Sequence, residues 1–366
     1  MTTLTLNTLP SLTIPPLDAA AIKAAQARQN QLTKPPGSLG KLETLAIWLA
    51  GCQATSQPSI NRPHITIFAA DHGVTEAGIS AFPAVVTQEM VKNFSRGGAA
   101  ITVIARAENA HFEVVDVGIF ESVGERTHLV IDRVGAGTAN FLKTPAMTEA
   151  ELEAALNVGR RAVERTLANQ ADLFIGGEMG IGNTTAATAL ICQQTGISPS
   201  QAIGAGTGLT AEQLPHKQQV IEQALAKHQQ AMHTPMQALQ HLGGFEIAAL
   251  TGAYLTAAQH GLPILIDGVI SSAAALIAVQ TCPDSLAWMQ FAHQSVEPAQ
   301  QAVFKALGVE PLLDLGMRLG EGSGAAMALP IVKLACQLHN QMATFEEASV
   351  STADEQAISS AHANHA

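Results

Sequence analysis

The stretch that decides the fold is HITIFAADHG, residues 64–73. Its first part, His64–Ala70, is short, apolar and β-branched, which is typical of a buried strand. The strand is expected to end at Asp71-His72-Gly73, where polar residues and a glycine follow the apolar run. Such a strand with a polar loop at its carboxyl end is the start of a strand–loop–helix unit, and similar units follow along the chain.

Four further strands are expected, at 111–119, 172–175, 262–266 and 286–291, and helical patterns lie between them. This alternation predicts an α/β protein with a parallel sheet and crossover helices. In such sheets, ligands bind outside the carboxyl ends of the strands. The residues expected at these ends are Asp71, Asp116, Glu178, Asp267 and Ser295. Because one edge of the sheet would collect all of them, this edge is the predicted active site.

The composition is that of a large α/β protein, because 47% of the 366 residues are hydrophobic and only 13% are charged. The net charge is −11 and the 19 basic residues form no run, so no nucleic-acid-binding surface is expected. The four cysteines lie far apart, which indicates neither a disulfide framework nor a zinc site. The N-terminal segment does not resemble a signal peptide, and the longest apolar run, Val269–Val279, is too short to cross a bilayer. We therefore expect a soluble, cytoplasmic protein that has no membrane partner.

Helical patterns precede the first expected strand, and the second of them is predicted to be capped by Ser38. Because these helices come before any strand, they are expected to lie beside the sheet as a separate helical part. The polar composition of the last residues predicts a tail without fixed structure. The expected division is a small helical domain of residues 1–60 with about 325–350, a large α/β domain of residues 61–324, and a mobile tail of residues 351–366.

The segment Leu312–Pro330, LLDLGMRLGEGSGAAMALP, places one carboxylate, Glu321, inside a turn of three glycines. Glycine permits positive φ angles and the close approach of another molecule. A helical pattern follows, so the turn opens a helix. Glu321 is therefore either a catalytic base or an exposed turn charge, and on this stretch alone the exposed charge is the more frequent outcome.

The segment Gly177–Thr184 resembles the phosphate-binding P-loop, except that Asn183 stands in place of the lysine. A glycine turn before a helix presents backbone N–H groups and the positive end of the helix dipole to a phosphate. Without its lysine the turn suits a monophosphate, with Thr184 as a further donor and Lys217 as a source of positive charge. The alternatives are that the glycines only permit close packing of strand and helix, and that Lys217 is a solvated residue at a helix start.

Other polar residues allow two interpretations. Asp71 and His72 are adjacent on an extended chain, so their side chains are expected to point apart rather than to pair. Asp267 either binds ribose hydroxyl groups or caps the next helix.

The apolar residues Met179, Phe82 and Phe245 either line the pocket of an aromatic ligand or belong to the core.

Several long blocks resemble one family, the nicotinate-nucleotide–dimethylbenzimidazole phosphoribosyltransferases of cobalamin biosynthesis. Together they span the chain from about residue 34 to 347, and blocks in one order are more specific than any single glycine motif. The blocks are KPPGSLGKLE at 34–43, DHGVTEAGISAFPAVVTQEMVKNFSRGGAA at 71–100, GGEMGIGNTTAATAL at 176–190, GAGTGL at 204–209, LIDGVISSAAAL at 265–276 and LDLGMRLGEGSGAA at 313–326.

The resemblance implies a Rossmann-like parallel sheet with flanking helices, a small helical domain built from both chain ends, and a homodimer. It implies transfer of the phosphoribosyl group of nicotinate mononucleotide to 5,6-dimethylbenzimidazole, without a metal or cofactor. The products would be α-ribazole 5′-phosphate and nicotinate. By their places in the matching blocks, Glu321 is the general base, and Ser80 and Gln88 face the benzimidazole. The residues that match the phosphoribosyl cradle are Glu178, Gly180, Asn183, Thr184, Lys217, Asp267 and Ser295.

The chemistry of this reaction needs one base. The leaving nitrogen is already a pyridinium, whereas benzimidazole must lose its N–H proton as its other nitrogen attacks the anomeric carbon. A carboxylate whose pKa is raised by a dry pocket suits this step, and Glu178 or Asp267 is expected to stabilise developing oxocarbenium charge. Two alternatives stay open: a nucleotide sensor without catalysis on the same fold, and a transferase for another base, whose choice depends on residues 74–88.

Overall fold

The computed structural model describes residues 3–204, 206 and 208–351. The expected tail from residue 352 onward lies outside the described residues. The same holds for Ala205 and Thr207 of the second glycine turn.

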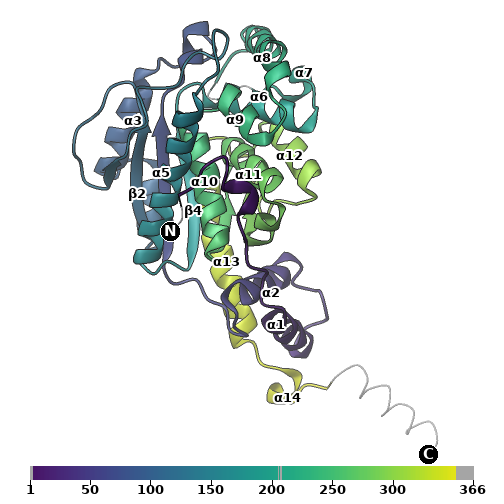
Figure 1. The fold of residues 1–366 in the computed structure, drawn as a ribbon. Coiled ribbons are helices and arrows are strands. Elements are labelled where there is room, and N and C mark those ends of the chain that lie inside the picture. The colour runs from purple at the N-terminus through teal and green to yellow at the C-terminus, as the bar shows by residue number, and fades with distance from the viewer. Residues whose placement is uncertain (1–2, 205, 207, 352–366) are drawn as a thin grey trace, which may run out of the picture. The chain divides into compact units, whose positions relative to one another are not determined.

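The chain divides into two compact units (Figure 1). The larger unit contains the residues up to Pro16 together with Asn61–Leu329, and the smaller unit contains Leu17–Ile60 and the residues from Pro330 on. The sequence pattern places the residues before Leu17 in the small helical domain, whereas in the structure they group with the larger unit.

The larger unit is built on a six-stranded sheet in which all neighbouring strands are parallel. The strand order is β3-β2-β1-β4-β5-β6, which is the order of a doubly wound nucleotide-binding fold. The predicted α/β fold with a Rossmann-like parallel sheet is thereby confirmed. The strands are β1 Pro63–Ala70, β2 His111–Gly118, β3 Leu129–Ile131, β4 Leu173–Met179, β5 Ile264–Ile266 and β6 Met289–Phe291.

Strand β1 lies in the middle of the sheet, and every one of its residues is buried. Burying a side chain such as Ile65, Ile67 or Phe68 stabilises the fold by roughly 1.5–3 kcal/mol. β1 pairs with β4 in a register that sets Phe68 opposite Glu178, so the two strands end at the same level. From this pair the chain continues toward β2 on one side and toward β5 on the other, and ligands bind at such a switch point.

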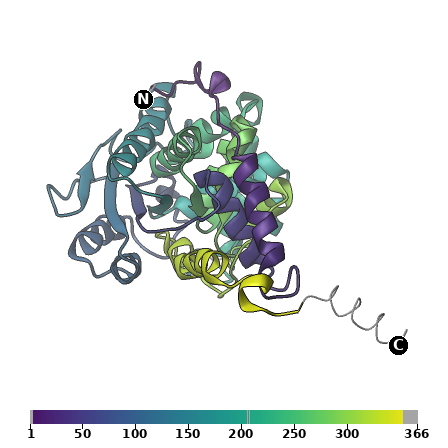
Figure 2. The ribbon, with the colours of Figure 1, turned by 90° about the horizontal axis from the view of Figure 1, so that it is seen from below.

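Helices flank the sheet on both faces (Figures 1 and 2). Crossover connections between parallel strands are right-handed, so connections that lead toward β3 and toward β6 lie on opposite faces. The helices are α1 Ala19–Gln31, α2 Lys41–Gln53, α3 Val85–Arg96, α4 Ala100–Ala107, α5 Glu149–Ala168, α6 Asn183–Thr195, α7 Pro199–Ala202, α8 Leu214–His228, α9 Pro235–Leu242, α10 Phe245–Gln259, α11 Val269–Thr281, α12 Ala299–Leu307, α13 Ser323–Gln341 and α14 Phe345–Ala348, with short 3-10 turns at Leu9–Ser11, Gly73–Ala77, Gln229–Ala231 and Pro283–Trp288.

Some elements differ from those expected. Strand β3 has only three residues, which is too short for a recognisable period. The cap of α2 is Gly40 and not Ser38, because hydrogen-bonded turns continue as far as Gly40 before the helix begins. The last strand begins at Met289 rather than 286, because a 3-10 helix occupies the residues before it.

The smaller unit joins segments from both ends of the chain. Arg28 of α1 donates from Nε to the carbonyl of His339, at 2.7 Å, and from Nη2 to the carbonyl of Asn340, at 3.0 Å. Leu32 and Thr344 form an antiparallel bridge. These contacts hold α1 and the last turns of α13 together within this unit.

The four cysteines form no disulfide and are buried, as expected of small apolar side chains. In the part of the chain that the structure describes, no helix is both long enough and apolar enough to cross a membrane.

Candidate active site

The turn that carries Glu321 is left-handed over successive residues. Gly320, Glu321 and Gly322 have φ angles of 84°, 61° and 71°. A non-glycine residue at positive φ is uncommon and persists only where the surroundings hold it. Here Asp267, which follows β5, accepts hydrogen bonds from the backbone N–H groups of Gly322, at 3.1 Å, and Ala325, at 2.8 Å. The turn is therefore fixed to the carboxyl edge of the sheet.

The carboxyl group of Glu321 is buried, with 5% of the residue exposed. Burial raises its pKa to about 7, with a smaller contribution from the negative charge of Asp267, while the backbone N–H of Ile101 opposes the shift. Its Oε2 has no hydrogen-bond partner among the described residues. Glu321 is thus not an exposed turn charge, and a carboxyl group with this pKa is suited to proton transfer near neutral pH.

Asp267 has the role of a cap. Both of its oxygens accept backbone hydrogen bonds from the Glu321 turn and α13, and His293 Nε2 lies 3.5 Å from its Oδ1. It is not among the residues that line the two cavities described below. The cap differs from the one considered from the sequence, because the next helix, α11, has Gly268 as its N-cap, and Asp267 instead caps the start of α13. We therefore treat Asp267 as a residue that positions the Glu321 turn.

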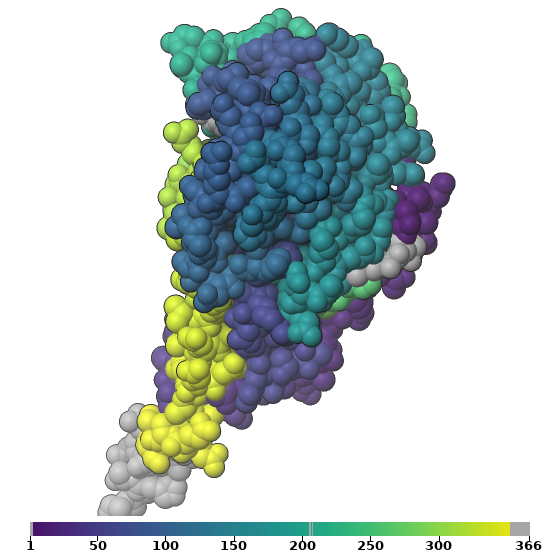
Figure 3. Space-filling view, turned by 90° about the vertical axis from the view of Figure 1, so that its left-hand side faces the viewer, coloured from purple at the N-terminus to yellow at the C-terminus, as the bar shows by residue number. Residues whose placement is uncertain are grey.

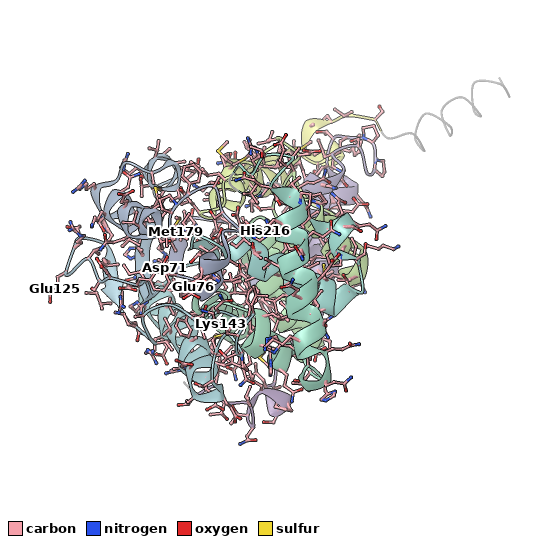
Figure 4. The ribbon with its side chains drawn as sticks, turned by 90° about the horizontal axis from the view of Figure 1, so that it is seen from above. Asp71, Glu76, Glu125, Lys143, Met179 and His216 are labelled. Carbon is pink, nitrogen blue, oxygen red and sulfur yellow. The ribbon has the colours of Figure 1, made fainter. Side chains whose placement is uncertain are left out.

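A cavity of about 60 Å³ lies at this edge of the sheet, and Figure 4 looks onto the edge from above; we call it the polar cavity because charged and hydrogen-bonding residues line much of it. It brings together most of the residues expected to bind the phosphoribosyl group. From β4 and α6 come Glu178, Gly180, Asn183 and Thr184, and from the segment after β6 comes Ser295. Glu321 lines the same cavity.

The glycine turn between β4 and α6 serves both purposes considered from the sequence. Gly180 packs against the carbonyl of Ala70, where a Cβ atom would overlap it, so this glycine is required for close packing. Gly182, with a φ of 98°, is the N-cap of α6, and the following residues Asn183 and Thr184 line the cavity. The N-terminus of α6 therefore opens onto the polar cavity, where its dipole favours an anion.

Lys217 is fully buried and is not a solvated helix-start residue. Its Nζ donates to Thr184 Oγ1 at 3.1 Å and to the carbonyl of Gly204 at 3.4 Å. Burial lowers the pKa of Lys217 to about 8, although the nearby Glu297 carboxylate opposes the change. Lys217 is not among the residues that line the cavity, so it supports the site from behind Thr184.

Glu178 is buried beside the Glu321 turn. Asn183 Nδ2 donates to its Oε2, and its Oε1 lies against Gly320, where a Cβ atom would meet it. Burial raises the pKa of Glu178 to about 8, and the charges of Asp267, Glu246 and Glu321 add to the shift. At pH 7 the carboxyl group of Glu178 is therefore largely neutral.

An apolar cavity of about 500 Å³ adjoins the polar one. The segment at Met317–Leu319 borders residues 82–90, and Figure 3 shows the yellow-green chain beside the blue surface of that region. Glu321 lines both cavities, so this residue stands where they meet. The side chains that give this cavity its apolar character are Phe82, Val86, Met90, Met179, Ile181, Met317 and Leu319.

Ser80 and Gln88, which are expected to face the benzimidazole, lie in different surroundings. Ser80 lines a neighbouring hollow that shares Phe82 with the apolar cavity. Gln88 lines neither cavity, because its amide donates to the carbonyl of Glu121 at 3.2 Å and accepts from Lys92 Nζ at 2.8 Å.

Of the apolar candidates, Phe82 and Met179 line the apolar cavity, whereas Phe245 is fully buried in the core.

Two acids at strand ends have structural partners instead. Asp116 forms an ion pair with Arg133 at 2.8 Å and accepts from the N–H of Ile119. Asp71 Oδ2 accepts from the N–H of Phe120 at 2.7 Å.

His72 Nε2 lies 2.6 Å from Glu246, so Asp71 and His72 do not pair with each other, as expected.

Sequence reasoning missed three polar residues that line the polar cavity: His293, Glu297 and Arg318. The first two flank the predicted Ser295, so their position after a strand was the available signal. Burial alone would lower the pKa of His293, but the adjacent Asp267 carboxylate raises it above its ordinary value. Glu297 Oε1 accepts from the N–H of Gly206 at 2.9 Å and holds the second glycine turn. Among the described residues, no group of three or more His, Cys, Asp or Glu side chains is arranged to hold a metal ion.

Comparisons with known proteins point to one family. A family model described as "Phosphoribosyltransferase" matches residues 14–350. A nicotinate-nucleotide–dimethylbenzimidazole phosphoribosyltransferase of Pseudomonas putida (strain W619) is 55% identical over 335 residues, which are 92% of this chain and 95% of the relative. The enzyme of that name from Xanthomonas oryzae pv. oryzae is 51% identical over 336 residues, 92% of this chain and 96% of the relative. A crystal structure of that enzyme from Thermus thermophilus matches with a TM-score of 0.87 and 41% identity, covering 92% of this chain and all of that one.

Proposed function

This chain belongs to the phosphoribosyltransferase family whose model it matches, and we propose that it transfers the phosphoribosyl group of nicotinate mononucleotide to 5,6-dimethylbenzimidazole. The products are α-ribazole 5′-phosphate and nicotinate. The observation that carries the proposal is the place of Glu321, a buried residue that lines both a polar and an apolar cavity. The polar cavity, of about 60 Å³, has room for the phosphate, and the apolar cavity, of about 500 Å³, has room for a flat aromatic base.

The phosphate binds at the N-terminus of α6 in this proposal. That helix end offers backbone N–H groups and the hydroxyl of Thr184, and Lys217 adds positive charge behind Thr184. The N-terminus of α11, at Gly268–Ile270, lines the same cavity and adds a second helix dipole. Two helix ends and one buried ammonium group give local positive potential within a chain whose net charge is −11.

Glu321 is the base in this mechanism. The benzimidazole in the apolar cavity presents its N–H to the carboxylate of Glu321 while its other nitrogen attacks the anomeric carbon of the nucleotide. The N–H bond breaks and the proton passes to Glu321, the new C–N bond forms, and the bond to the pyridinium nitrogen breaks with its electron pair leaving on nicotinate. Attack opposite the leaving group turns the β-nucleotide into an α-nucleotide. Fixing both rings in line accounts for much of the rate enhancement expected.

The carboxyl group of Glu178 can stabilise positive charge on the substrate only when it is ionised. Because burial and neighbouring acids raise its pKa to about 8, its carboxyl group is largely protonated at pH 7. A positively charged pyridinium or oxocarbenium group nearby lowers the pKa of an adjacent carboxyl group, so substrate binding favours its ionised form. Glu178 thus stabilises the developing charge only in the complex.

The proposal is tested by incubating the protein with nicotinate mononucleotide and a panel of benzimidazoles, purines and phenols, and detecting products by mass. We expect α-ribazole 5′-phosphate and equimolar nicotinate from dimethylbenzimidazole. Thermal stabilisation by the nucleotide without nicotinate release would instead identify a nucleotide sensor. Faster turnover with a purine or a phenol would identify a transferase for another base.

A further inference from the structure

Arg318 stands at the junction of the two cavities. It lines both of them, as Glu321 does, and its side chain is exposed. The backbone on either side is anchored, because the carbonyl of Met317 accepts from the N–H of Val296 at 3.3 Å and Gly322 donates to Asp267. The segment therefore has a defined path and holds the exposed Arg318 at the junction of the cavities.

The guanidinium group of Arg318 is available to a ligand. Arg133, Arg161 and Arg165 each form an ion pair with a carboxylate at 2.9 Å or less. Arg318 forms none with any described residue. Within the described chain it is also the one lysine or arginine that lines either cavity, beside the acids Glu178, Glu297 and Glu321.

The donor nucleotide of the proposed reaction carries two anionic groups at opposite ends. In the proposed function, the phosphate binds at the N-terminus of α6, near Lys217, which contacts Thr184. The carboxylate on the pyridine ring has to lie near the anomeric carbon, and so near Glu321 where the cavities meet. Any of the three acids that is ionised repels a carboxylate at this place, and Arg318 is the cation beside them.

We propose that Arg318 binds the carboxylate of the nicotinate ring and so selects nicotinate mononucleotide over nicotinamide mononucleotide. This assignment rests on the proposed function and adds to it the residue that determines the choice of donor. Guanidinium and carboxylate groups match in shape and charge, and the neutral amide of nicotinamide lacks this match. The same contact holds nicotinate as a product.

The test compares kcat/KM for the two mononucleotides in the full-length protein and in Arg318→Gln and Arg318→Lys, at low ionic strength because salt screens an exposed charge. We expect the wild type to prefer nicotinate mononucleotide by at least about tenfold, the effect of one charge-assisted hydrogen bond. In Arg318→Gln this preference should fall about tenfold, with kcat/KM for the nicotinamide donor changed less than about threefold. Arg318→Lys should lie between, and Lys227→Gln, which removes an exposed charge from α8 outside both cavities, should leave the preference unchanged.

Product inhibition gives a second measurement of the same contact. Inhibition by nicotinate should weaken about tenfold in Arg318→Gln, by the loss of the same hydrogen bond. An equal loss of kcat/KM with both donors would overturn the proposal, because it would place Arg318 on the shared phosphate or in the folding of the segment. Lack of any preference in the wild type would overturn it as well. If the wild type forms no α-ribazole 5′-phosphate from either donor, the proposed function itself fails, which is a different result.

Discussion

Replacing Glu321 by glutamine tests the base directly. The amide has nearly the shape of the carboxyl group, so the left-handed turn and its hydrogen bonds to Asp267 should survive. The variant loses only the capacity to accept the azole proton. We expect Glu321→Gln to bind nicotinate mononucleotide with nearly unchanged affinity and to lose catalysis.

The size of the effect follows from the pKa of about 7 for Glu321. About half of the free enzyme then carries the ionised base at pH 7, and about 1% at pH 5. General-base catalysis contributes typically about 10²–10⁴-fold to a rate. We therefore expect kcat/KM of the wild type to fall about tenfold per pH unit below 7, and Glu321→Gln to be slower by about 10²-fold or more at pH 8.

The assay follows α-ribazole 5′-phosphate by mass at pH 5–9 in both proteins. Protonation of the acceptor base in acid reduces the rate of both proteins alike, so the ratio of the two rates isolates the contribution of Glu321. Glu125→Gln is a matched control, because Glu125 is exposed on a loop far from the other labelled residues in Figure 4. If Glu321→Gln kept the wild-type rate, or if the ratio did not change between pH 5 and 8, the assignment of the base would be refuted.

Three further predictions concern the residues around the base. Lys217→Met should raise the KM for nicotinate mononucleotide about tenfold or more, with kcat less affected, because it removes the buried ammonium group behind Thr184; steady-state kinetics measures both. In Gly324→Ala the new methyl group would overlap the His293 ring, so denaturant unfolding should show a loss of roughly 1–3 kcal/mol. Since the pKa of Glu178 is raised in the folded state, its contribution to stability is present below the ordinary glutamate pKa of 4.5 and is lost as the pH rises toward 8. Glu178→Gln should therefore be more stable than the wild type at pH 9, by on the order of 4 kcal/mol, and an unfolding curve that shows no gain would contradict this.

The sheet was predictable because its strands are buried on both faces. An apolar, β-branched run such as His64–Ala70 has few other environments, and its residues are indeed all buried. The edge that carries the site was predictable once the strands were expected to be parallel, since parallel strands bring their carboxyl ends together. Glu178 and Ser295 accordingly line one cavity with Glu321.

The partners of individual side chains were not predictable. Asp267 caps the Glu321 turn because the N–H groups of Gly322 and Ala325 face it, and this depends on how a distant segment returns to the sheet. The wall of the apolar cavity joins Phe82 to Met317, which are far apart in the chain and follow no shared period. A sequence indicates which residues are apolar or charged, whereas a cavity is defined by which of them face each other.

The left-handed turn also has a consequence for protein engineering. A non-glycine residue in this conformation costs roughly 1 kcal/mol relative to glycine, and Glu321 adds to this the burial of an ionisable group. Glycine at this position would remove both costs, and the neighbours Gly320 and Gly322 already have that freedom. A selection for thermal stability alone would therefore favour Glu321→Gly, which on the proposed mechanism is a robust but inactive protein, so any stabilised library of this enzyme has to be screened for turnover as well.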